Sequence, residues 1–288
     1  MLQILETISE GGRTGKPNED AFGYTNTHAW VIDGATGVAD SELLGGPSDA
    51  RWLSHGVSEF FAQNAERSDS DLKALVRSSI EASKTRYERE ATRAVNGRYE
   101  WPSAAMILVH CDGQAIRIAN FADCRLLLLG DDGSFADYTE RHGDRSPKSK
   151  ARTAALLEKA GPEGDPFAVP EVMAYLRTSR SYQNRADGYW ILGIDPEATD
   201  HMQQWTHHLK TPVTGLLMSD GFASLAYDYK QIAPAELVAM ARDEGLASVV
   251  KAIRKFERED DPQMKIFPRF KRCDDATAVL FRAAPVQA

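Results

Sequence analysis

The sequence predicts an α+β fold in which an antiparallel β-sandwich carries helix pairs on its outer faces. Two observations predict it: apolar runs with the length of strands occur in clusters, and helical patterns occur in adjacent pairs. The strict alternation of strands and helices that a parallel α/β fold needs is absent. The 288 residues can bury a substantial core, and no linker, internal repeat or low-complexity tract interrupts them. We therefore expect one domain over residues 1–288.

The N-terminal third begins with strands and continues with two long helices. Short apolar runs bounded by polar or Gly-rich segments predict strands at residues 2–8, 21–24 and 29–32. Apolar residues that recur every three or four positions predict helices at about 48–66 and 69–95. Their N-termini are suited to capping by Ser48-Asp49 and Ser70-Asp71. Two such amphipathic helices in succession indicate an αα pair that lies on a sheet.

The middle of the chain returns to short apolar runs. Turn residues separate them, which predicts a meander of antiparallel strands at 104–111, 115–120 and 125–130. Residues 148–161 are again helical. Residues 162–187 show no clean period beyond one or two helical turns at Val169–Leu176, so we expect an insertion or flap there.

The C-terminal third repeats the order of strands followed by a helix pair. We expect strands at Tyr189–Ile194, Gln204–Leu209 and Val213–Ser219. The amphipathic helices that follow are expected at Pro234–Glu244 and Leu246–Glu257, and the last strand at Ala276–Phe281.

Composition and charge argue against several classes of protein. The chain is 42% hydrophobic and 26% charged, which is ordinary for a globular protein, and its formal net charge is -8. Nucleic acid and anionic membranes need a basic face, so neither is expected as a partner. No apolar segment reaches 18 residues, and the N-terminus lacks the pattern of a signal peptide. Three well-separated cysteines indicate neither a disulfide framework nor a zinc site, so a reducing cytoplasm is expected.

Acidic residues stand at the ends of several apolar runs. The run within Ala29–Gly37 ends abruptly at Asp33-Gly34, which would hold one carboxylate at a fixed strand end. Apolar runs suggest burial, and buried carboxylates are costly unless they are paired or bind a cation. Oxygen ligands with few His or Cys residues favour Mg²⁺ or Mn²⁺ over Zn²⁺. Taken singly, each Asp-Gly pair is more simply explained as an ordinary turn. Only the combined pattern of these acids can indicate a functional site.

The joint pattern resembles the metal-dependent Ser/Thr protein phosphatases, the protein phosphatase 2C-like family, in their bacterial form. Five motifs occur in the family's order over about residues 5–283, with a helix pair between the second and the third. They are Asn18-Glu19-Asp20-Ala21, Val31-Ile32-Asp33-Gly34 with Gly37, Ala119-Asn120-Phe121-Ala122-Asp123-Cys124-Arg125, Ser219-Asp220-Gly221, and Asp274-Asp275-Ala276-Thr277.

The resemblance implies a four-layer α-β-β-α sandwich with two Mn²⁺ or Mg²⁺ ions at one edge of the sheets. It implies that Asp33 bridges both metals and that the Gly34 carbonyl binds the second. By the same resemblance, Asp220 and Asp274 hold the first metal, Glu19 and Asp20 act mainly through metal-bound waters, and Asp123 helps to bind a third, weaker ion. The implied reaction is attack of a metal-bridging hydroxide on phosphoserine or phosphothreonine, without a phosphoenzyme.

The sequence departs from the family at several positions. Many members have His-Gly-Gly after the Asp-Gly pair, and that His is a proposed general acid; here Ala35-Thr36-Gly37 occupies the place. For the phosphate-binding Arg, both Arg13 and Lys16 are candidates. Arg13 is slightly favoured because a guanidinium grips phosphate at two points, and a solvated basic loop is the alternative. Ala122 stands where Gly is common in the family. Asp275 stands where Asn is common, so we expect Asp275 to support the metal ligands without binding a metal itself.

These implications leave two alternatives to an active protein phosphatase. One is a regulatory pseudophosphatase that binds a partner protein, which loss of Asp33 or Asp220 would have favoured. The other is a phosphatase of a small phosphorylated metabolite, because specificity is expected to lie in the flap. The expected partners are a phosphorylated protein substrate and a cognate Ser/Thr kinase, and the expected role is in signalling.

Overall fold

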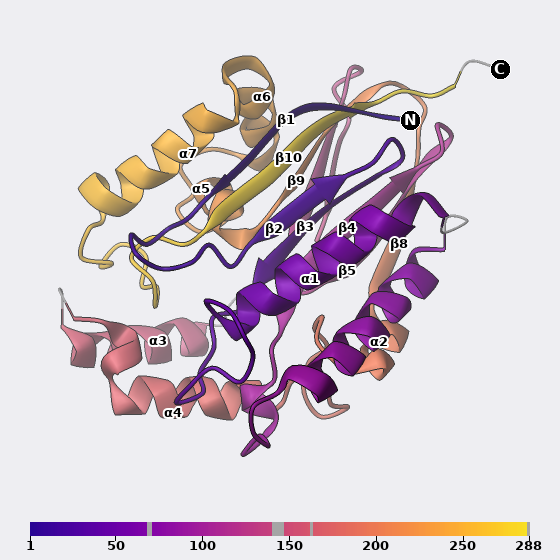
Figure 1. Ribbon diagram of the computed structural model, residues 1–288. Helices are drawn as coiled ribbons and strands as arrows, with labels where there is room; N and C mark the ends of the chain where they lie inside the picture. Colours follow the sequence, from indigo (N-terminus) through magenta and orange to yellow (C-terminus); the bar gives the residue numbers. More distant parts are fainter. Residues whose placement is uncertain (68–70, 140–146, 162–163, 287–288) are drawn as a thin grey trace.

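Two antiparallel β-sheets pack face to face, and helices cover both outer faces (Figure 1). The computed structural model describes residues 1–67, 71–139, 147–161 and 164–286. The predicted α+β class and the order of helix, sheet, sheet and helix layers are confirmed. Within the described residues, no helix is long and apolar enough to cross a bilayer.

Each sheet has five strands and brings together distant parts of the chain. In spatial order, the first sheet consists of β1 (Leu2–Glu10), β10 (Ala276–Ala283), β9 (Val213–Met218), β6 (Arg125–Gly130) and β7 (Phe135–Tyr138). The second sheet consists of β2 (Ala21–Tyr24), β3 (His28–Gly34), β4 (Ala104–Cys111), β5 (Ala115–Phe121) and β8 (Gln203–His208). The strands nearest the two ends of the chain pair with each other, since Leu2 lies opposite Ala283.

The helices fall into three groups. The second sheet is covered by α1 (Asp49–Asn64) and α2 (Leu72–Glu90), and the first sheet by α5 (Asp220–Tyr227), α6 (Pro234–Glu244) and α7 (Leu246–Lys255). The third group, α3 (Pro147–Ala160) and α4 (Pro170–Arg180), lies beyond the end of the sandwich opposite to both termini (Figure 1). Short turns of other helical types lie at Ala65–Arg67, Arg98–Glu100, Pro166–Ala168, Pro196–His201 and Phe256–Asp260.

Strand alternation determines which side chains enter the space between the sheets. In β3, Trp30 and Ile32 pack under α1, while Ala29 and Val31 face the other sheet. Each fully buried aliphatic side chain in these layers contributes roughly 1.5–3 kcal/mol. Asp33 follows Val31 by two positions, so the same alternation aims its carboxylate between the sheets.

Helix starts agree with the capping signals of the sequence. Ser48 accepts a hydrogen bond from the backbone N–H of Arg51 at 3.2 Å, and Asp71 accepts one from Ala74 at 3.0 Å. The other proposed cap, Ser70, lies outside the described residues.

The predicted meander is wrong in its third strand. β4 and β5 form a hairpin, but β6 crosses to the other sheet and pairs with β9 and β7. β5 and β6 are buried on both faces, so the local pattern was compatible with either sheet. The connection through Ala122, whose φ is 60°, redirects the chain instead of closing a hairpin.

Three further elements differ from expectation. Tyr189–Ile194 is not a strand, because only isolated bridges join Gln183 to Tyr189 and Ala104 to Leu192. The sequence interpretation also missed β7 and α5. β7 is a short edge strand with an exposed Phe135, and α5 follows β9 so directly that its apolar residues extended the strand pattern.

Candidate metal centre

Four aspartates from four separate segments meet where the space between the sheets ends. They are Asp20 just before β2, Asp33 in β3, Asp220 at the start of α5 and Asp274 just before β10. Asp20 is buried, while the other three are half-buried. Each sheet contributes two of them, so the pairing of the sheets assembles the site.

Burial and mutual repulsion oppose ionisation of this cluster. Burial, together with the charges of Asp275 and Asp274, raises the pKa of Asp20 to about 8. Burial and the neighbouring Asp20 and Asp220 raise the pKa of Asp33 well above its ordinary range. Burial and Asp274 raise the pKa of Asp220 to about 6. The protein alone therefore holds protons where a cation would neutralise the same charges.

The glycines that follow two of these aspartates permit close approach of the backbone. A Cβ at Gly34 would lie 2.5 Å from the Glu19 carbonyl oxygen, and one at Gly221 would lie 2.0 Å from the Asp275 carbonyl oxygen. Gly34 remains within the β3 strand, so its role is to leave space and not, as the sequence suggested, to make a sharp turn. The Asp-Gly pairs thus bring the strand ends together.

Glu19 and Asp275 fix the loop that enters the site from β1. The Asp275 carboxylate accepts hydrogen bonds from the backbone N–H groups of Gly12 and Glu19, both at 2.8 Å. The buried Glu19 side chain accepts a hydrogen bond from the Thr36 hydroxyl. Asp275 therefore binds backbone in this structure, and Glu19 faces the loop that follows Asp33.

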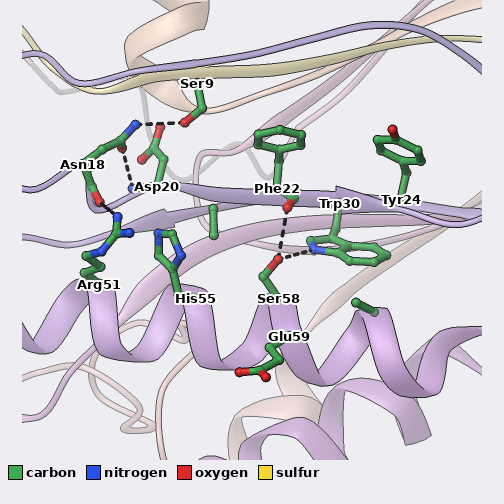
Figure 2. Close-up of a pocket in the computed structure, with 13 residues that line it drawn as sticks. Ser9, Asn18, Asp20, Phe22, Tyr24, Trp30, Arg51, His55, Ser58 and Glu59 are labelled. Atoms are coloured by element: carbon green, nitrogen blue, oxygen red, sulfur yellow. Dashed lines mark hydrogen bonds between the residues drawn. The ribbon is translucent and has the colours of Figure 1, made fainter. Parts of the chain in front are cut away.

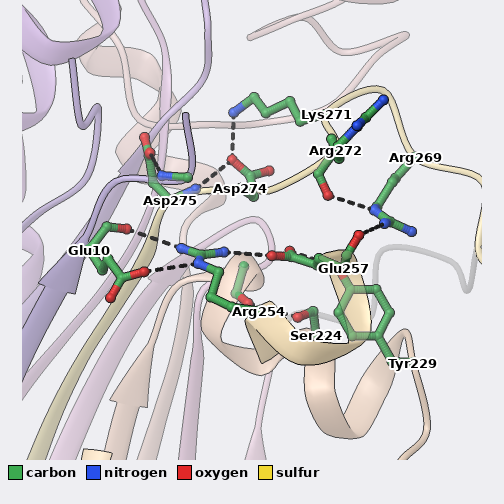
Figure 3. A network of polar contacts seen from close by, with 12 residues as sticks. Glu10, Ser224, Tyr229, Arg254, Glu257, Arg269, Lys271, Arg272, Asp274 and Asp275 are labelled. Atoms are coloured by element: carbon green, nitrogen blue, oxygen red, sulfur yellow. Dashed lines mark hydrogen bonds and ion pairs between the residues drawn. The ribbon is translucent and has the colours of Figure 1, made fainter. Parts of the chain in front are cut away.

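Lys271 is a site residue that the sequence interpretation missed. Its ammonium group lies 2.7 Å from an oxygen of Asp274, and despite its burial the carboxylates of Asp274 and Asp33 raise its pKa (Figure 3). The signal available was the basic run Arg269–Arg272 directly before Asp274. Such runs are usually solvated faces, so the run alone does not indicate a site residue.

A paired network of charges supports the segment that leads to Asp274. Arg254 donates to Glu10 at 3.0 Å and to Glu257 at 2.8 Å (Figure 3). Arg269 donates to Asp261 at 2.7 Å. We call Glu10, Tyr229, Arg254, Glu257, Asp261 and Arg269 the Arg254 network.

The structure places the remaining predicted residues at the margin of the cluster. The Arg13 guanidinium lies 5.7 Å from the ring centre of Phe167, and Lys16 is exposed in a turn. In the described part of the chain, neither forms an ion pair with one of the four aspartates. Asp123 is exposed, yet its charge contributes to the raised pKa of Asp220, which places it beside that carboxylate.

A cavity of about 690 Å³ lies next to Asp20, between β2 and α1 (Figure 2). Its wall includes Arg51, His55 and Ser58 from α1 and Trp30 from β3. The Nε2 atom of His55 is buried there and has no hydrogen-bond partner among the described residues. The cavity therefore opens beside Asp20, at the start of β2.

The donor set fits hard divalent cations. The Oδ2 atom of Asp20 is buried without a hydrogen-bond partner in the described part of the chain, which is costly for a carboxylate. Carboxylate oxygens are the ligands that Mg²⁺ and Mn²⁺ prefer. Over the described residues, however, no three His, Cys, Asp or Glu side chains already form a finished metal-binding group.

Comparison with known proteins defines the class. The sequence profile of protein phosphatase 2C matches residues 11–258. The chain therefore belongs to the protein phosphatase 2C family, as its motifs indicated. It is thus a Mn²⁺- or Mg²⁺-dependent phosphatase of phosphoserine and phosphothreonine. None of the curated proteins is similar enough in sequence to match.

Solved structures share the fold at low sequence identity. The catalytic domain of the Ser/Thr protein phosphatase PstP, solved with two manganese ions, is 16% identical with a TM-score of 0.55, over 98% of this chain and 100% of that one. A Ser/Thr phosphatase of S. agalactiae is 14% identical with a TM-score of 0.55, over 99% and 100%. PppA of Pseudomonas aeruginosa, described as a regulatory component of T6SS, is 15% identical with a TM-score of 0.53, over 96% and 95%.

Proposed function

We propose that Asp33 is the central ligand of the metal centre and would hold both of two Mn²⁺ or Mg²⁺ ions. Asp220 and Asp274 would hold the first ion, and the carbonyl of Gly34 the second. The observation that carries this assignment is the meeting of four aspartates, whose charge Lys271 alone does not balance. When bound, such ions lower the pKa of a coordinated water and neutralise phosphoryl oxygens.

The outer acids have separate roles in this proposal. Glu19 and Asp20 would act through water, which fits the hydrogen bonds that already occupy Glu19. Asp123 would help to hold a third, weaker ion, and its exposed position beside Asp220 supports that. Asp275 would position Glu19 by holding its backbone N–H.

The chain's own side chains favour direct attack by water over a cysteine phosphoenzyme. Cys124 is fully buried, and its burial, with the charges of Asp33 and Asp123, raises its pKa well above the ordinary value. It therefore stays a thiol, which is a poor nucleophile. Ala35 offers no proton to the leaving group, so another group must supply it.

We further propose that the substrate is a phosphoprotein made by a cognate Ser/Thr kinase, and that the enzyme acts in cytoplasmic signalling. Three free, buried cysteines suit a reducing compartment. We treat residues 1–288 as one phosphatase domain, because the strands from its two ends pair with each other. Within residues 162–187, which we assign to a flap, residues 162 and 163 lie outside the described part.

The test is phosphate release from p-nitrophenyl phosphate and from a phosphothreonine peptide. We expect release to need Mn²⁺ or Mg²⁺, to stop with chelator, and to fall at least about a thousandfold in Asp33→Ala. Asp187→Ala, which removes an exposed carboxylate paired with Arg185, serves as the matched control. Full activity in chelator or in Asp33→Ala would refute the assignment. Mn²⁺ binding without turnover of either substrate would favour the pseudophosphatase, and turnover of p-nitrophenyl phosphate alone would favour a metabolite substrate.

A further inference from the structure

The C-terminal end of α4 is fixed to the loop that follows Asp33-Gly34. Arg177 donates from Nε to the Val38 carbonyl at 2.8 Å and from Nη2 to Asp40 at 2.6 Å. One turn further on, Arg180 donates from Nη1 to the Ala35 carbonyl at 3.3 Å. Arg180 therefore contacts the backbone two residues after Asp33, the proposed bridging ligand, although Arg180 itself comes from a distant segment of the chain.

Arg180 is a desolvated cation that has no carboxylate partner in the part of the chain that the structure describes. It is half-buried, and burial lowers its pKa, while the charge of Glu19 opposes that shift. Among the described residues, no Asp or Glu side chain lies within ion-pair distance of it. By contrast, Arg254 and Arg269, which are buried in the described part of the chain, have carboxylate partners at 2.8 and 2.7 Å.

A guanidinium stays charged at all ordinary pH values, so its desolvation has to be compensated. It carries five N–H donors in a planar fork, and one hydrogen bond to Ala35 leaves the others available. That fork matches two oxygens of a phosphoryl group. Because the described residues offer this fork no anion, a phosphoryl group fits the position.

We propose that Arg180 binds the phosphoryl group of the substrate and orients it over the aspartate cluster. The proposal rests on the proposed function, since it names the residue that receives the substrate at the same site. It assigns phosphate binding to the C-terminal end of α4, whereas the family resemblance placed it at Arg13 or Lys16 in the loop Gly11–Pro17. It also fits the position of Arg13, whose guanidinium lies over Phe167 of the same α3–α4 segment.

The experiment compares Arg180→Gln and Arg180→Lys with the wild type in full-length protein. We measure KM and kcat for a phosphothreonine peptide, inhibition by inorganic phosphate, and Mn²⁺ affinity by titration calorimetry. For Arg180→Gln we expect KM and the phosphate inhibition constant to rise about 10- to 100-fold, with unchanged Mn²⁺ affinity, because a charged hydrogen bond is lost. Arg180→Lys should recover part of that loss, since it keeps the charge without the fork.

Two further variants separate phosphate binding from a purely structural role. Arg177→Gln weakens the attachment of α4 to Val38 and Asp40 but leaves Arg180 in place, and Arg185→Gln removes an exposed positive charge. A phosphate inhibition constant for Arg180→Gln within twofold of wild type, or an equal rise in Arg177→Gln, overturns the proposal. Changed Mn²⁺ affinity in Arg180→Gln also overturns it.

Titration calorimetry also tests the role of Arg180 independently of the proposed function. Binding of inorganic phosphate to Mn²⁺-loaded protein is measured directly, without turnover. If the wild type binds phosphate and Arg180→Gln does not, Arg180 holds phosphate even where no substrate is hydrolysed. If the wild type hydrolyses the peptide and Arg180→Gln matches it, the proposed function stands and the role of Arg180 fails.

Discussion

The aspartate cluster and the Arg254 network are two groups of desolvated charge on either side of the chain segment that leads into β10. In the network, opposite charges are matched: the buried Arg254 and Glu257 form an ion pair at 2.8 Å, and Tyr229 donates a further bond to Glu257 at 3.0 Å. In the cluster, four acids face one another, and within the described residues Lys271 is the one cation that forms an ion pair with them.

The two regions differ in how their buried charges are compensated. The matched network needs nothing from outside, and its hydrogen bonds hold the segment before Asp274 in place. The cluster is internally repulsive and is stable as anions only with a cation. A change of one carboxylate should therefore have opposite effects on stability in the two places.

The largest expected effect is the loss of a network carboxylate. Glu257→Gln removes the charge beside Arg254 and leaves that arginine with only the more exposed Glu10. Because the remaining charge is buried, we expect the free energy of unfolding to fall by about 3–5 kcal/mol. Urea denaturation in chelator measures it.

The matched change in the cluster is Asp33→Asn, also an acid replaced by its amide. It removes repulsion from Asp20 and Asp220, so in chelator we expect stability equal to or above that of the wild type. A loss comparable with that of Glu257→Gln would show that the two regions do not differ as described.

An intermediate effect is expected from pH and metal. Asp20 has an ordinary pKa of 3.8 and a pKa of about 8 in the folded protein, so between about pH 4 and pH 8 the unfolded chain releases this proton first. Without metal, stability from this group therefore falls as pH rises through that window. Mn²⁺ at about a hundred times its Kd should restore about 2.7 kcal/mol, and more fully at pH 8 than at pH 6 because protons compete with it.

Thermal and urea unfolding at several pH values, with chelator or Mn²⁺, measures this dependence. Asp20→Asn is the control, because the difference between it and the wild type isolates one group from the rest of the chain. A pH profile in chelator that is the same for both proteins would contradict the raised pKa.

The smallest effect concerns the connection beside the cluster. Ala122 has a φ of 60°, a conformation that costs a residue with a Cβ about 1–2 kcal/mol. After allowance for the greater freedom of Gly in the unfolded chain, Ala122→Gly should stabilise the protein by about 1 kcal/mol without changing activity. Ala136→Gly in β7, where no such φ occurs, should destabilise it. If urea denaturation showed that both variants raise the free energy of unfolding, or that both lower it, this explanation would be refuted.

Much of the fold was predictable because its signals are local. A short apolar run that ends at Asp33 located β3, and helical periodicity located α1 and α2. β6 could not be assigned to a sheet, since its residues are apolar on both faces and either neighbour would bury them. α5 was missed because eight residues directly after a strand give too short a periodic signal.

The acids of the site were identified by sequence because each lies at the end of a recognisable run. Lys271 and Arg180 were not, since neither has a local pattern that separates it from a solvated basic residue. Lys271 matters because folding brings it to 2.7 Å from Asp274, and Arg180 because α4 is fixed against Ala35.

The sequence by itself determined the family and the identity of the strand-end acids, since both depend on neighbours along the chain. The tertiary structure alone decided which carboxylates repel one another, which cations approach them, and which buried charges are paired. Those properties depend on distances between segments up to hundreds of residues apart, such as Glu19 and Asp275, which are joined by a 2.8 Å hydrogen bond. Electrostatic energy follows such distances and the local desolvation, neither of which periodicity along the chain encodes.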